Sequence, residues 1–332
     1  MLRKAAVNSR GAILLGKCFA CDSFDDARPQ RVVTHAHYDH LTGLQHSLRK
    51  CKAVIMTAAT KDLLEAMRGR WSLTRGNVKT LAYEEPLVYE DEKLTLYFAD
   101  HILGTAQVLV EDAEGTRILY TSDFRLPRTP IINADVLVIE ATYGNPMQVR
   151  PFKNVVKNAL VSLVERGLKQ GPVYIFGYHG KLQEVMQILR NSRVKAPFIV
   201  PEKVFRISEI CEKHGMKLGR YLLFSEDEAQ SMLKKNDSYT ALYHMNSRRY
   251  IGKGAFRILV SGWEFSSPRR QIGDSEHIVA LSDHSDFEGL LQYVDESKPK
   301  LVITDNYRAG AAKTLAKHIE KRLRIPAKPL PE

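Results

Sequence analysis

The segment from His35 to His40 constrains this chain more than any other part of its sequence. It reads His-Ala-His-Tyr-Asp-His, so four side chains that can bind a metal ion fall within six residues. Apolar residues precede it and predict a short strand over 31–33, which places these side chains in the loop that follows. Imidazole and carboxylate groups are ligands that zinc uses in catalytic sites. Three of the 11 histidines stand in this segment, so we interpret it as a metal-binding loop and not as an ordinary polar turn.

Further polar residues stand at the ends of predicted strands. The strands predicted over 94–100, 118–122, 136–139 and 277–281 lead into His101, Asp123, Glu140 and His284, respectively. Loops at strand ends are where folded scaffolds collect functional side chains. Taken alone, each is more often a cap or turn residue, and Asp283 can simply cap the helix that begins near Asp286. Together with the histidine-rich segment, these residues predict one shared site.

Strand and helix signals divide the chain into a β-rich part and an alternating part. Up to 146, short strands dominate, including one over 12–21 and two hairpins over 87–98 and 108–122. Beyond 146, predicted helices over 154–170, 181–190 and 204–214 alternate with strands over 172–177 and 197–201. Strands over 256–262, 278–281 and 300–304 and helices over 287–296 and 309–323 complete the chain. We therefore expect a β-rich α/β domain interrupted by a smaller inserted α/β domain.

The order of the polar residues resembles the pattern of the metallo-β-lactamase superfamily. That pattern is H-x-H-x-D-H followed by a histidine and an aspartate at strand ends, which His101 and Asp123 match. Glu140, the predicted insert and the segment Ser282–Asp286 resemble the β-CASP nucleases, the nucleic-acid-processing branch. Within this branch the chain is similar to ligase-associated DNA exonucleases and to archaeal-type relatives of the mRNA 3′-end-processing nuclease. The resemblance implies an α/β fold, namely an αββα sandwich over 1–146 and 276–332 with a β-CASP insert over 147–275.

The same resemblance implies a set of metal ligands. The ligands of a first metal would be His35, His37 and His101, and those of a second would be Asp39, His40 and Asp123, with Asp123 shared. Asp22 would orient the metal loop. The implied cofactor is zinc, as one or two ions, with manganese or iron as alternatives. Some members carry a further histidine after a strand, whereas here the strand predicted over 301–304 leads into Asp305 and Asn306 as the corresponding contact.

The resemblance also implies a chemistry. Zinc lowers the pKa of a bound water from about 15.7 to about 7, and the resulting hydroxide can attack a phosphodiester. Asp39, Asp123, Glu140 and His284 would take part in catalysis, with His284 as general acid or phosphate contact, positioned by Glu140. The implied function is a zinc-dependent nuclease acting on single-stranded DNA or RNA. The choice between exo- and endonuclease, the polarity and the oligomeric state stay open.

The charge of the chain favours a polyanionic partner. Lys and Arg number 49 against 38 Asp and Glu, a formal net charge of +11. Two segments are candidates for substrate binding: His179, Gly180 and Lys181 before a predicted helix, and Ser261, Trp263, Arg269 and Arg270 after a predicted strand. The N–H groups of a helix start suit phosphate, and an indole can stack on a base. An ordinary turn at Gly180 and core packing of Trp263 are the alternatives.

Other features of the sequence limit the cellular compartment in which we expect the protein. No apolar run approaches the ~20 residues of a membrane-spanning helix, and no apolar segment of signal-peptide length follows the basic N-terminus. Cys18, Cys21, Cys51 and Cys211 are too few and too scattered for a disulfide framework. We therefore expect a cytoplasmic protein, with Cys18 and Cys21 as buried structural thiols and not as a metal or redox pair.

Two rival functions remain at this stage. The first is a zinc hydrolase of small molecules with the same fold, such as a β-lactamase, lactonase or thioesterase, either as the main function or as a side activity. The second is an inactive subunit that only binds nucleic acid. Such subunits lose ligands, whereas this chain keeps all six principal ones.

Overall fold

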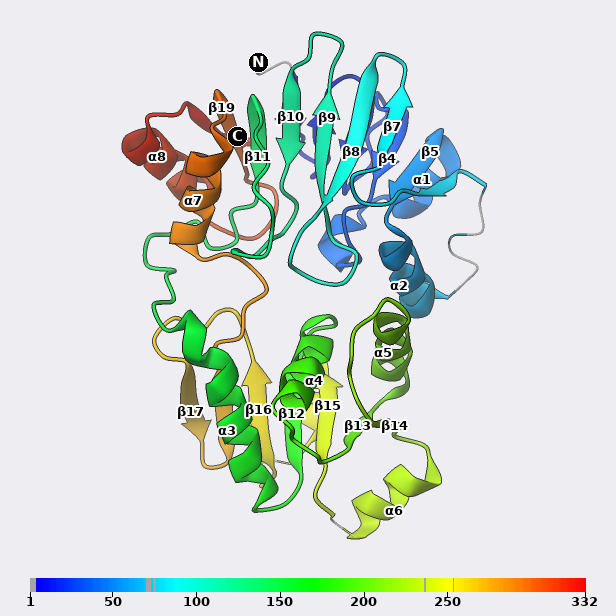
Figure 1. Ribbon diagram of the computed structural model, residues 1–332, viewed down its shortest axis with the longest axis vertical. Coiled ribbons are helices and arrows are strands. Elements are labelled where there is room, and N and C mark those ends of the chain that lie inside the picture. Colours follow the sequence, from blue (N-terminus) through cyan, green and yellow to red (C-terminus); the bar gives the residue numbers. More distant parts are fainter. Residues whose placement is uncertain (1–3, 70–72, 74–75, 236, 253) are drawn as a thin grey trace. The chain divides into compact units, whose positions relative to one another are not determined.

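The computed structural model describes residues 4–69, 73, 76–235, 237–252 and 254–332, and it contains two compact units (Figure 1). Unit 1 combines the chain up to Val149 with the chain from His284 onward, and unit 2 is Arg150–Asp283. Unit 2 is thus an insertion in the sequence of unit 1. It ends later than the expected boundary at 275, because the strand Glu276–Val279 pairs with strands of unit 2.

The first sheet of unit 1 carries the metal loop. Its strands, in spatial order, are β1 (Ala5–Val7), β2 (Ile13–Leu15), β3 (Phe19–Cys21), β4 (Gln30–Val32), β5 (Ala53–Met56) and β6 (Val78–Thr80). The single strand expected over 12–21 is wrong, since the chain turns at Gly16 and forms the antiparallel pair β2 and β3. The Glu92 carboxylate accepts from the backbone N–H groups of Lys17 and Cys18 in this turn, which explains the break.

The second sheet of unit 1 joins segments from both ends of the chain. Its spatial order is β20 (Ala327–Leu330), β19 (Leu301–Asp305), β11 (Val136–Ile139), β10 (Arg117–Tyr120), β9 (Ala106–Glu111), β8 (Glu92–Phe98) and β7 (Pro86–Tyr89). The strands from β7 to β10 are antiparallel, and β10, β11, β19 and β20 are parallel. The expected hairpins over 87–98 and 108–122 correspond to β7–β8 and β9–β10.

Side-chain alternation explains why this sheet is buried on both faces. Val136 and Val138 of β11 belong to the cluster between the two sheets, and Leu137 and Ile139 belong to the cluster beneath the helices. The helices that cover this second face are α7 (Phe287–Ser297) and α8 (Ala312–Leu323). Successive side chains of a strand point to opposite faces of its sheet, so the residues of one apolar run contribute alternately to two hydrophobic clusters.

The first sheet has helices of its own. They are α1 (Leu44–Lys50), which contacts β5, and α2 (Ala58–Arg68), and a short 3₁₀ helix η1 (Tyr38–His40) lies within the metal loop. Unit 1 therefore has helix–sheet–sheet–helix layers (Figure 1). This arrangement, with an additional α/β unit, confirms the predicted fold class.

Unit 2 is built on one mostly parallel sheet. Its spatial order is β14 (Tyr221–Leu223), β13 (Phe198–Val200), β15 (Thr240–His244), β12 (Val173–Gly177), β16 (Phe256–Val260), β18 (Glu276–Val279) and β17 (Arg269–Gly273), of which only β17 is antiparallel to its neighbour among the described pairs. The helices that pack on it are α3 (Val156–Leu168), α4 (Lys181–Asn191), α5 (Glu202–Lys213) and α6 (Asp227–Lys235), and two 3₁₀ helices are η3 (Lys153–Val155) and η4 (Met245–Tyr250).

Two further expectations concern membranes and thiols. Across the described ranges, no helix combines the length and the apolar character needed to cross a bilayer. The four cysteines are buried and free. Burial, reinforced by Glu92 and Glu90, raises the pKa of the Cys18 thiol to about 12, so this thiol is not a reactive thiolate at neutral pH.

Candidate metal centre

The metal loop (His35–His40) follows β4 after Val33 and Thr34. Its two end histidines, His35 and His40, are fully buried, and His37 is half-buried. The Asp39 side chain between them is 61% exposed. The loop therefore turns its histidines into unit 1 while Asp39 stays accessible to solvent.

Asp123 lies among these histidines and His101. Its Oδ2 atom is 3.3 Å from Nε2 of His40 and 3.6 Å from Nε2 of His35 and of His101. Asp123 follows β10 and His101 follows β8, which are strands of the second sheet, whereas the metal loop follows the first sheet. The two sheets thus bring donors from distant parts of the sequence to one point.

The remaining two predicted ligands join the same cluster. Nδ1 of His37 is 2.9 Å from Nε2 of His101, and Oδ2 of Asp39 is 3.4 Å from Nε2 of His40. One donor atom each of His35, His37, His101 and Asp123 lies within 4.8 Å of the others. All six predicted ligands are therefore close enough together to surround one or two metal ions.

Two buried ring nitrogens fit a metal ion. Nε2 of His35 and Nε2 of His40 are buried and have no hydrogen-bond partner within the described part of the chain. Leaving a buried polar atom unsatisfied costs about 1–3 kcal/mol, a cost that coordination would remove. Burial, followed by the neighbouring His40 and His101, lowers the pKa of His35, which is therefore in the neutral form that binds metals. Imidazoles with carboxylates suit zinc and also fit manganese or iron.

Asp22 orients His40. It directly follows β3 with a left-handed φ of 61°, and its Oδ2 lies 2.7 Å from Nδ1 of His40. The backbone N–H and the hydroxyl of Thr34 donate to the two carboxylate oxygens at 2.8 Å. Burial opposes ionisation of Asp22, but His40, Arg308 and the Thr34 N–H together outweigh it, so the pKa of Asp22 is lowered. These contacts are the ones expected of a residue that fixes a metal-binding histidine.

Sequence reasoning missed the residues that hold His35. Nδ1 of His35 is 3.1 Å from the Thr34 hydroxyl and 3.3 Å from the Ser122 hydroxyl, which in turn donates to Thr34 Oγ1 at 2.8 Å. Ser122 also has a left-handed φ of 55°. Their place in the sequence could have identified them, because Thr34 and Ser122 directly precede the predicted ligands His35 and Asp123.

A second missed residue is Arg31, whose side chain is fully buried within β4. Its guanidinium donates to the carbonyl oxygens of Thr42 at 2.7 Å and of His40 at 3.1 Å, and to the Ser47 hydroxyl at 3.0 Å. Arg31 thus fixes the end of the metal loop through these backbone contacts. The presence of an arginine in a strand with buried neighbours could have indicated this role.

Glu140 and His284 form a pair beside the ligands. Nδ1 of His284 is 3.1 Å and 3.0 Å from the two Glu140 oxygens, and the Phe124 N–H donates to Glu140 Oε1 at 3.0 Å. The His284 ring centroid is 4.7 Å from that of His101. Both residues therefore lie where the sequence predicted a catalytic pair.

The side chains of Asp305 and Asn306, from which a further metal contact was expected, are engaged with other residues of unit 1. Oδ1 of Asp305 accepts from the Tyr307 N–H, and Oδ2 pairs with Arg308 at 2.7 Å. The Asn306 amide donates to the Pro331 carbonyl. Within the described residues, neither side chain belongs to a group of converging metal donors. The side chains of Asp305 and Asn306 thus contact residues next to the C-terminal strands β19 and β20.

In unit 2, the first substrate-binding segment is largely engaged within the chain. Lys181 is buried and pairs with Asp283 at 2.9 Å, and the Gly180 N–H donates to the Gln183 side chain. His179 lies beside His244, with ring centroids 5.0 Å apart. These donors are therefore less suited to a phosphate than the sequence indicated.

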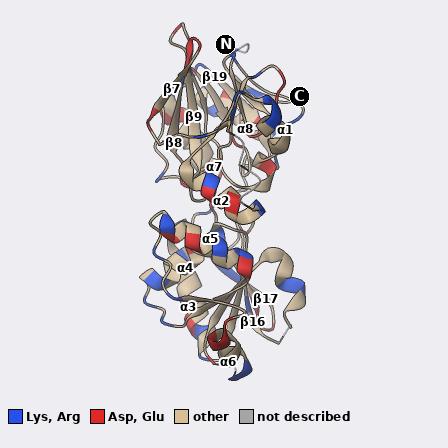
Figure 2. Ribbon diagram, turned by 90° about the vertical axis from the view of Figure 1, so that its right-hand side faces the viewer, with Lys and Arg blue, Asp and Glu red and all other residues tan. Residues whose placement is uncertain are grey.

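The second segment is more accessible. Trp263 is 57% exposed, which contradicts core packing. The backbone N–H of Trp263 donates to the Ser261 hydroxyl. Arg270 pairs with Glu264, and Arg269 is exposed on β17. Lysines and arginines occur on elements of both units, with acidic residues among them (Figure 2).

Comparison with known proteins gives matches along much of the chain. The profile of the metallo-beta-lactamase superfamily matches residues 32–194. The chain is 41% identical over 138 residues to an uncharacterized protein in the lig 3′ region of Acidianus ambivalens, spanning 99% of that protein and 41% of this chain. It is 32% identical over 193 residues to the RNase J-like protein of Methanocaldococcus jannaschii, across 50% of this chain and 44% of that protein.

Other matches extend further along this chain. A probable DNA ligase of Opitutus terrae is 27% identical over 286 residues, which cover 82% of this chain and 26% of the ligase. A solved structure from Enterococcus faecalis, of a protein of unknown function, superposes on 93% of this chain and 81% of its own with a TM-score of 0.64 at 14% identity, and so supports the fold alone. This chain thus spans less than half of the ligase and of the RNase J-like protein. With the converging side chains and the inserted unit, these matches show that the chain belongs to the metallo-β-lactamase superfamily, in its β-CASP branch.

Proposed function

We propose that the protein is a zinc-dependent phosphodiesterase that cleaves single-stranded DNA or RNA. The observation that carries this proposal is the position of Asp123, whose Oδ2 lies within 3.6 Å of three imidazole Nε2 atoms. A carboxylate in such a place can be shared between two metal ions, which is the arrangement that stabilises both oxygens of a phosphodiester displacement.

The ligands divide into two sets under this proposal. One ion would be held by His35, His37 and His101, and the second by Asp39, His40 and Asp123, with Asp123 common to both. When bound, zinc supplies Lewis acidity toward the phosphoryl oxygens and activates the attacking water. Asp22 keeps the His40 ring in the orientation that directs Nε2 toward Asp123.

His284 is the proposed proton donor to the leaving oxygen. Its Nδ1 lies 3.1 Å and 3.0 Å from the two oxygens of Glu140, a contact that fixes the orientation of the ring. Glu140 is itself held by the Phe124 N–H, directly after the ligand Asp123, so the proton donor and the metal ligands have a common support. Glu140 is a positioning residue, and His284 is the catalytic residue of this pair.

A nucleic-acid substrate is supported by three observations. Relatives of the chain are named a DNA ligase and an RNase J-like protein, although the chain spans only part of each. The net charge of +11 favours a polyanion. Unit 2, which we propose as the β-CASP domain, presents the exposed Trp263 and Arg269 as substrate contacts.

Four free cysteines fit a reducing compartment, and we propose the cytoplasm as the location of the protein.

End-labelled substrates test this proposal. Single-stranded DNA and RNA labelled at the 5′ or the 3′ end are incubated with the protein, with nitrocefin in a parallel reaction. We expect metal-dependent cleavage of at least one strand, and the position of the label reports polarity. Hydrolysis of nitrocefin without cleavage of any strand would instead establish a small-molecule hydrolase, and no hydrolysis of either with metal bound would refute both.

A further inference from the structure

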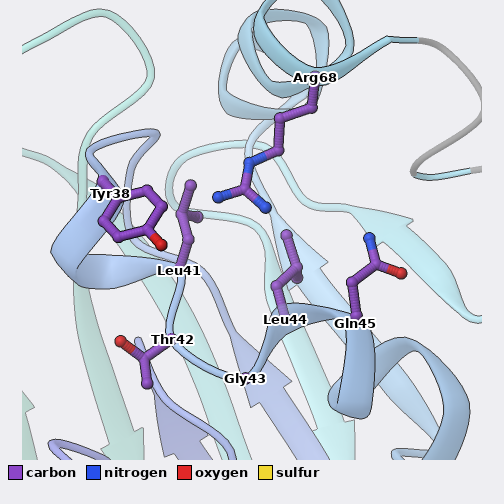
Figure 3. A pocket seen from close by; sticks show the side chains of 7 residues that line it. All are labelled: Tyr38, Leu41, Thr42, Gly43, Leu44, Gln45 and Arg68. Atoms are coloured by element: carbon purple, nitrogen blue, oxygen red, sulfur yellow. The ribbon is translucent and has the colours of Figure 1, made fainter.

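A pocket of about 310 Å³ lies in unit 1 beside the metal loop (Figure 3). Tyr38, which directly precedes the ligand Asp39, forms one wall, and Arg68 at the end of α2 forms another. The buried Leu41 and Leu44 provide an apolar floor. Thr42, Gly43 and Gln45 complete the lining. None of these side chains is a metal ligand, yet one wall is part of the metal loop.

Tyr38 is an exposed aromatic residue that the fold does not use. Its side chain is 83% exposed, and it contributes to no core cluster among the described residues. The Arg68 guanidinium carbon lies 5.8 Å from the centroid of its ring. Exposed aromatic rings next to a cation are the platform on which proteins stack the bases of single strands.

Polar groups with no assigned role surround this ring. Within the described part of the chain, the Arg68 guanidinium has no carboxylate partner, and the side chains of Thr42 and Gln45 make no hydrogen bond. A guanidinium suits a phosphate, and an amide or hydroxyl can read the edge of an unpaired base. The pocket therefore offers a stacking surface, a cation and hydrogen-bonding groups, and none of its seven described lining residues is acidic.

Both walls of the pocket are fixed to the metal centre. Arg31 donates to the carbonyl oxygens of His40 and Thr42, so the pocket floor and a metal ligand share one support. At the other wall, Thr57 caps the start of α2, and its hydroxyl donates to the Gly104 carbonyl at 2.8 Å. Gly104 lies three residues after the ligand His101. A ligand in this pocket would have a defined distance from the metal ligands.

We propose that this pocket is a nucleotide subsite, in which a base of the substrate strand stacks on Tyr38 and an adjacent phosphate pairs with Arg68. The inference rests on the proposed nuclease function and assigns one nucleotide of the bound strand to this pocket. Thr42 and Gln45 contact the edge of the base. Because a paired base cannot leave its stack without cost, the subsite selects single-stranded substrate.

Binding of an uncleavable strand tests the subsite. A fluorescently labelled single strand with phosphorothioate linkages is titrated with the metal-loaded protein, and the dissociation constant is read from anisotropy. Tyr38→Ala should weaken binding about tenfold, as expected for loss of one stacked base, whereas Tyr38→Phe should stay within about twofold of the wild type. Equal binding by Tyr38→Ala and the wild type would overturn the proposal, provided that both proteins carry the same amount of metal.

Salt dependence tests the role of Arg68. Loss of one phosphate contact should make the slope of log Kd against log salt shallower by about 0.7 in Arg68→Ala. Arg49→Ala is the matched control, because Arg49 is exposed on α1 in the same unit and does not line the pocket. Equal slopes for Arg68→Ala and the wild type, or equal changes for Arg68→Ala and Arg49→Ala, would contradict a specific phosphate contact.

The two proposals fail in different ways. If the wild-type protein binds the strand through Tyr38 but cleaves neither DNA nor RNA, the subsite stands and the nuclease function is wrong. If the wild type cleaves the strand and Tyr38→Ala both binds and cleaves it equally well, the nuclease function stands and the subsite is wrong.

Discussion

His35 and His40, the two fully buried histidines of the metal centre, are each oriented by a neighbouring oxygen atom. This oxygen contacts Nδ1 of the ring and leaves Nε2 available to a metal ion. Asp22 contacts Nδ1 of His40, and Thr34 contacts Nδ1 of His35, so that each Nε2 faces Asp123. The partner of one imidazole nitrogen decides which nitrogen is available to a metal. The sequence motif predicted which side chains converge here, Asp22 included, because they stand in a fixed order along the chain; that they bind a metal stays a prediction. It could not predict Thr34 and Ser122, because hydroxyl groups at strand ends are common.

Replacing Asp22 tests this orientation. Asp22→Asn keeps the shape of the side chain but removes the charge that faces His40, and we expect metal affinity to fall about 10–100-fold. Competition with a chelator of known affinity measures this change. Asp26→Asn is the control, because Asp26 is exposed and pairs only with Arg10 at 3.6 Å among the described contacts. If Asp22→Asn and Asp26→Asn retained equal amounts of metal, Asp22 would not support the ligand.

Replacing His284 separates proton donation from metal binding. His284→Ala should lower kcat by about 10²–10⁴-fold, the usual contribution of a general acid, with the metal content unchanged. Glu140→Gln should lower kcat less than His284→Ala does, because it leaves the imidazole in place and alters only the partner that orients it. Loss of metal from His284→Ala, measured by mass spectrometry, would place His284 among the ligands instead.

At the scale of elements, the patterns with the strongest periodicity were predicted well. The strand β11 and the helices α3, α4, α7 and α8 follow from apolar runs or helical spacing. The elements that were missed include β14, α6 and β15 of unit 2 and the helices α1 and α2 of unit 1. β14 has only three residues, too few for a clear strand pattern. Both β14 and β15 pair with β13 in the sheet of unit 2, and α6 contacts β14.

The loop between β4 and α1 depends on Arg31, which no periodicity reveals. Arg31→Met should lower the free energy of unfolding by about 3 kcal/mol, because it leaves the carbonyl groups of His40 and Thr42 without their buried donor. Chemical denaturation measures this loss, and metal affinity should fall with it. Arg49→Met, at an exposed position on α1, should change stability by less than about 0.5 kcal/mol. Equal stability of the two variants would contradict the role of Arg31.

At the scale of the whole molecule, the alternation of strands and helices was enough to predict an insertion. The C-terminal boundary was placed too early, because the strand Glu276–Val279 looks the same whether it pairs in unit 1 or in unit 2. Sequence also gave no sign of how the two segments of unit 1 are joined. Asp135, before β11, accepts from the Arg117 N–H at 2.9 Å and pairs with Lys300 at 2.7 Å, which links the N-terminal and C-terminal segments.

The link at Asp135 predicts a dependence of stability on pH. The Arg117 N–H, followed by Lys300, lowers the pKa of Asp135 below its ordinary value near 3.8. A lowered pKa in the folded state means that the contacts contribute fully above the unfolded-state value and are lost as the pH falls through the folded-state value. Asp135→Asn should therefore cost about 1 kcal/mol of unfolding free energy at pH 7 and almost nothing near pH 2.

Unfolding at a series of pH values measures this difference. Asp91→Asn serves as the control, because Asp91 forms an exposed pair with Lys17 at 3.7 Å and should change stability little at any pH. A difference between Asp135→Asn and the wild type that stayed constant from pH 7 to pH 2 would show that the charge of Asp135 is not responsible.

The central claim is that the cluster around Asp123 holds the metal that cleaves nucleic acid. Its most direct test is the rate of cleavage of an end-labelled single strand, measured against the amount of zinc bound per chain during titration of the metal-free protein. We expect cleavage to rise with bound zinc, and Asp123→Asn to lose both tight zinc binding and cleavage. Cleavage by the metal-free protein, or full cleavage by Asp123→Asn, would contradict it.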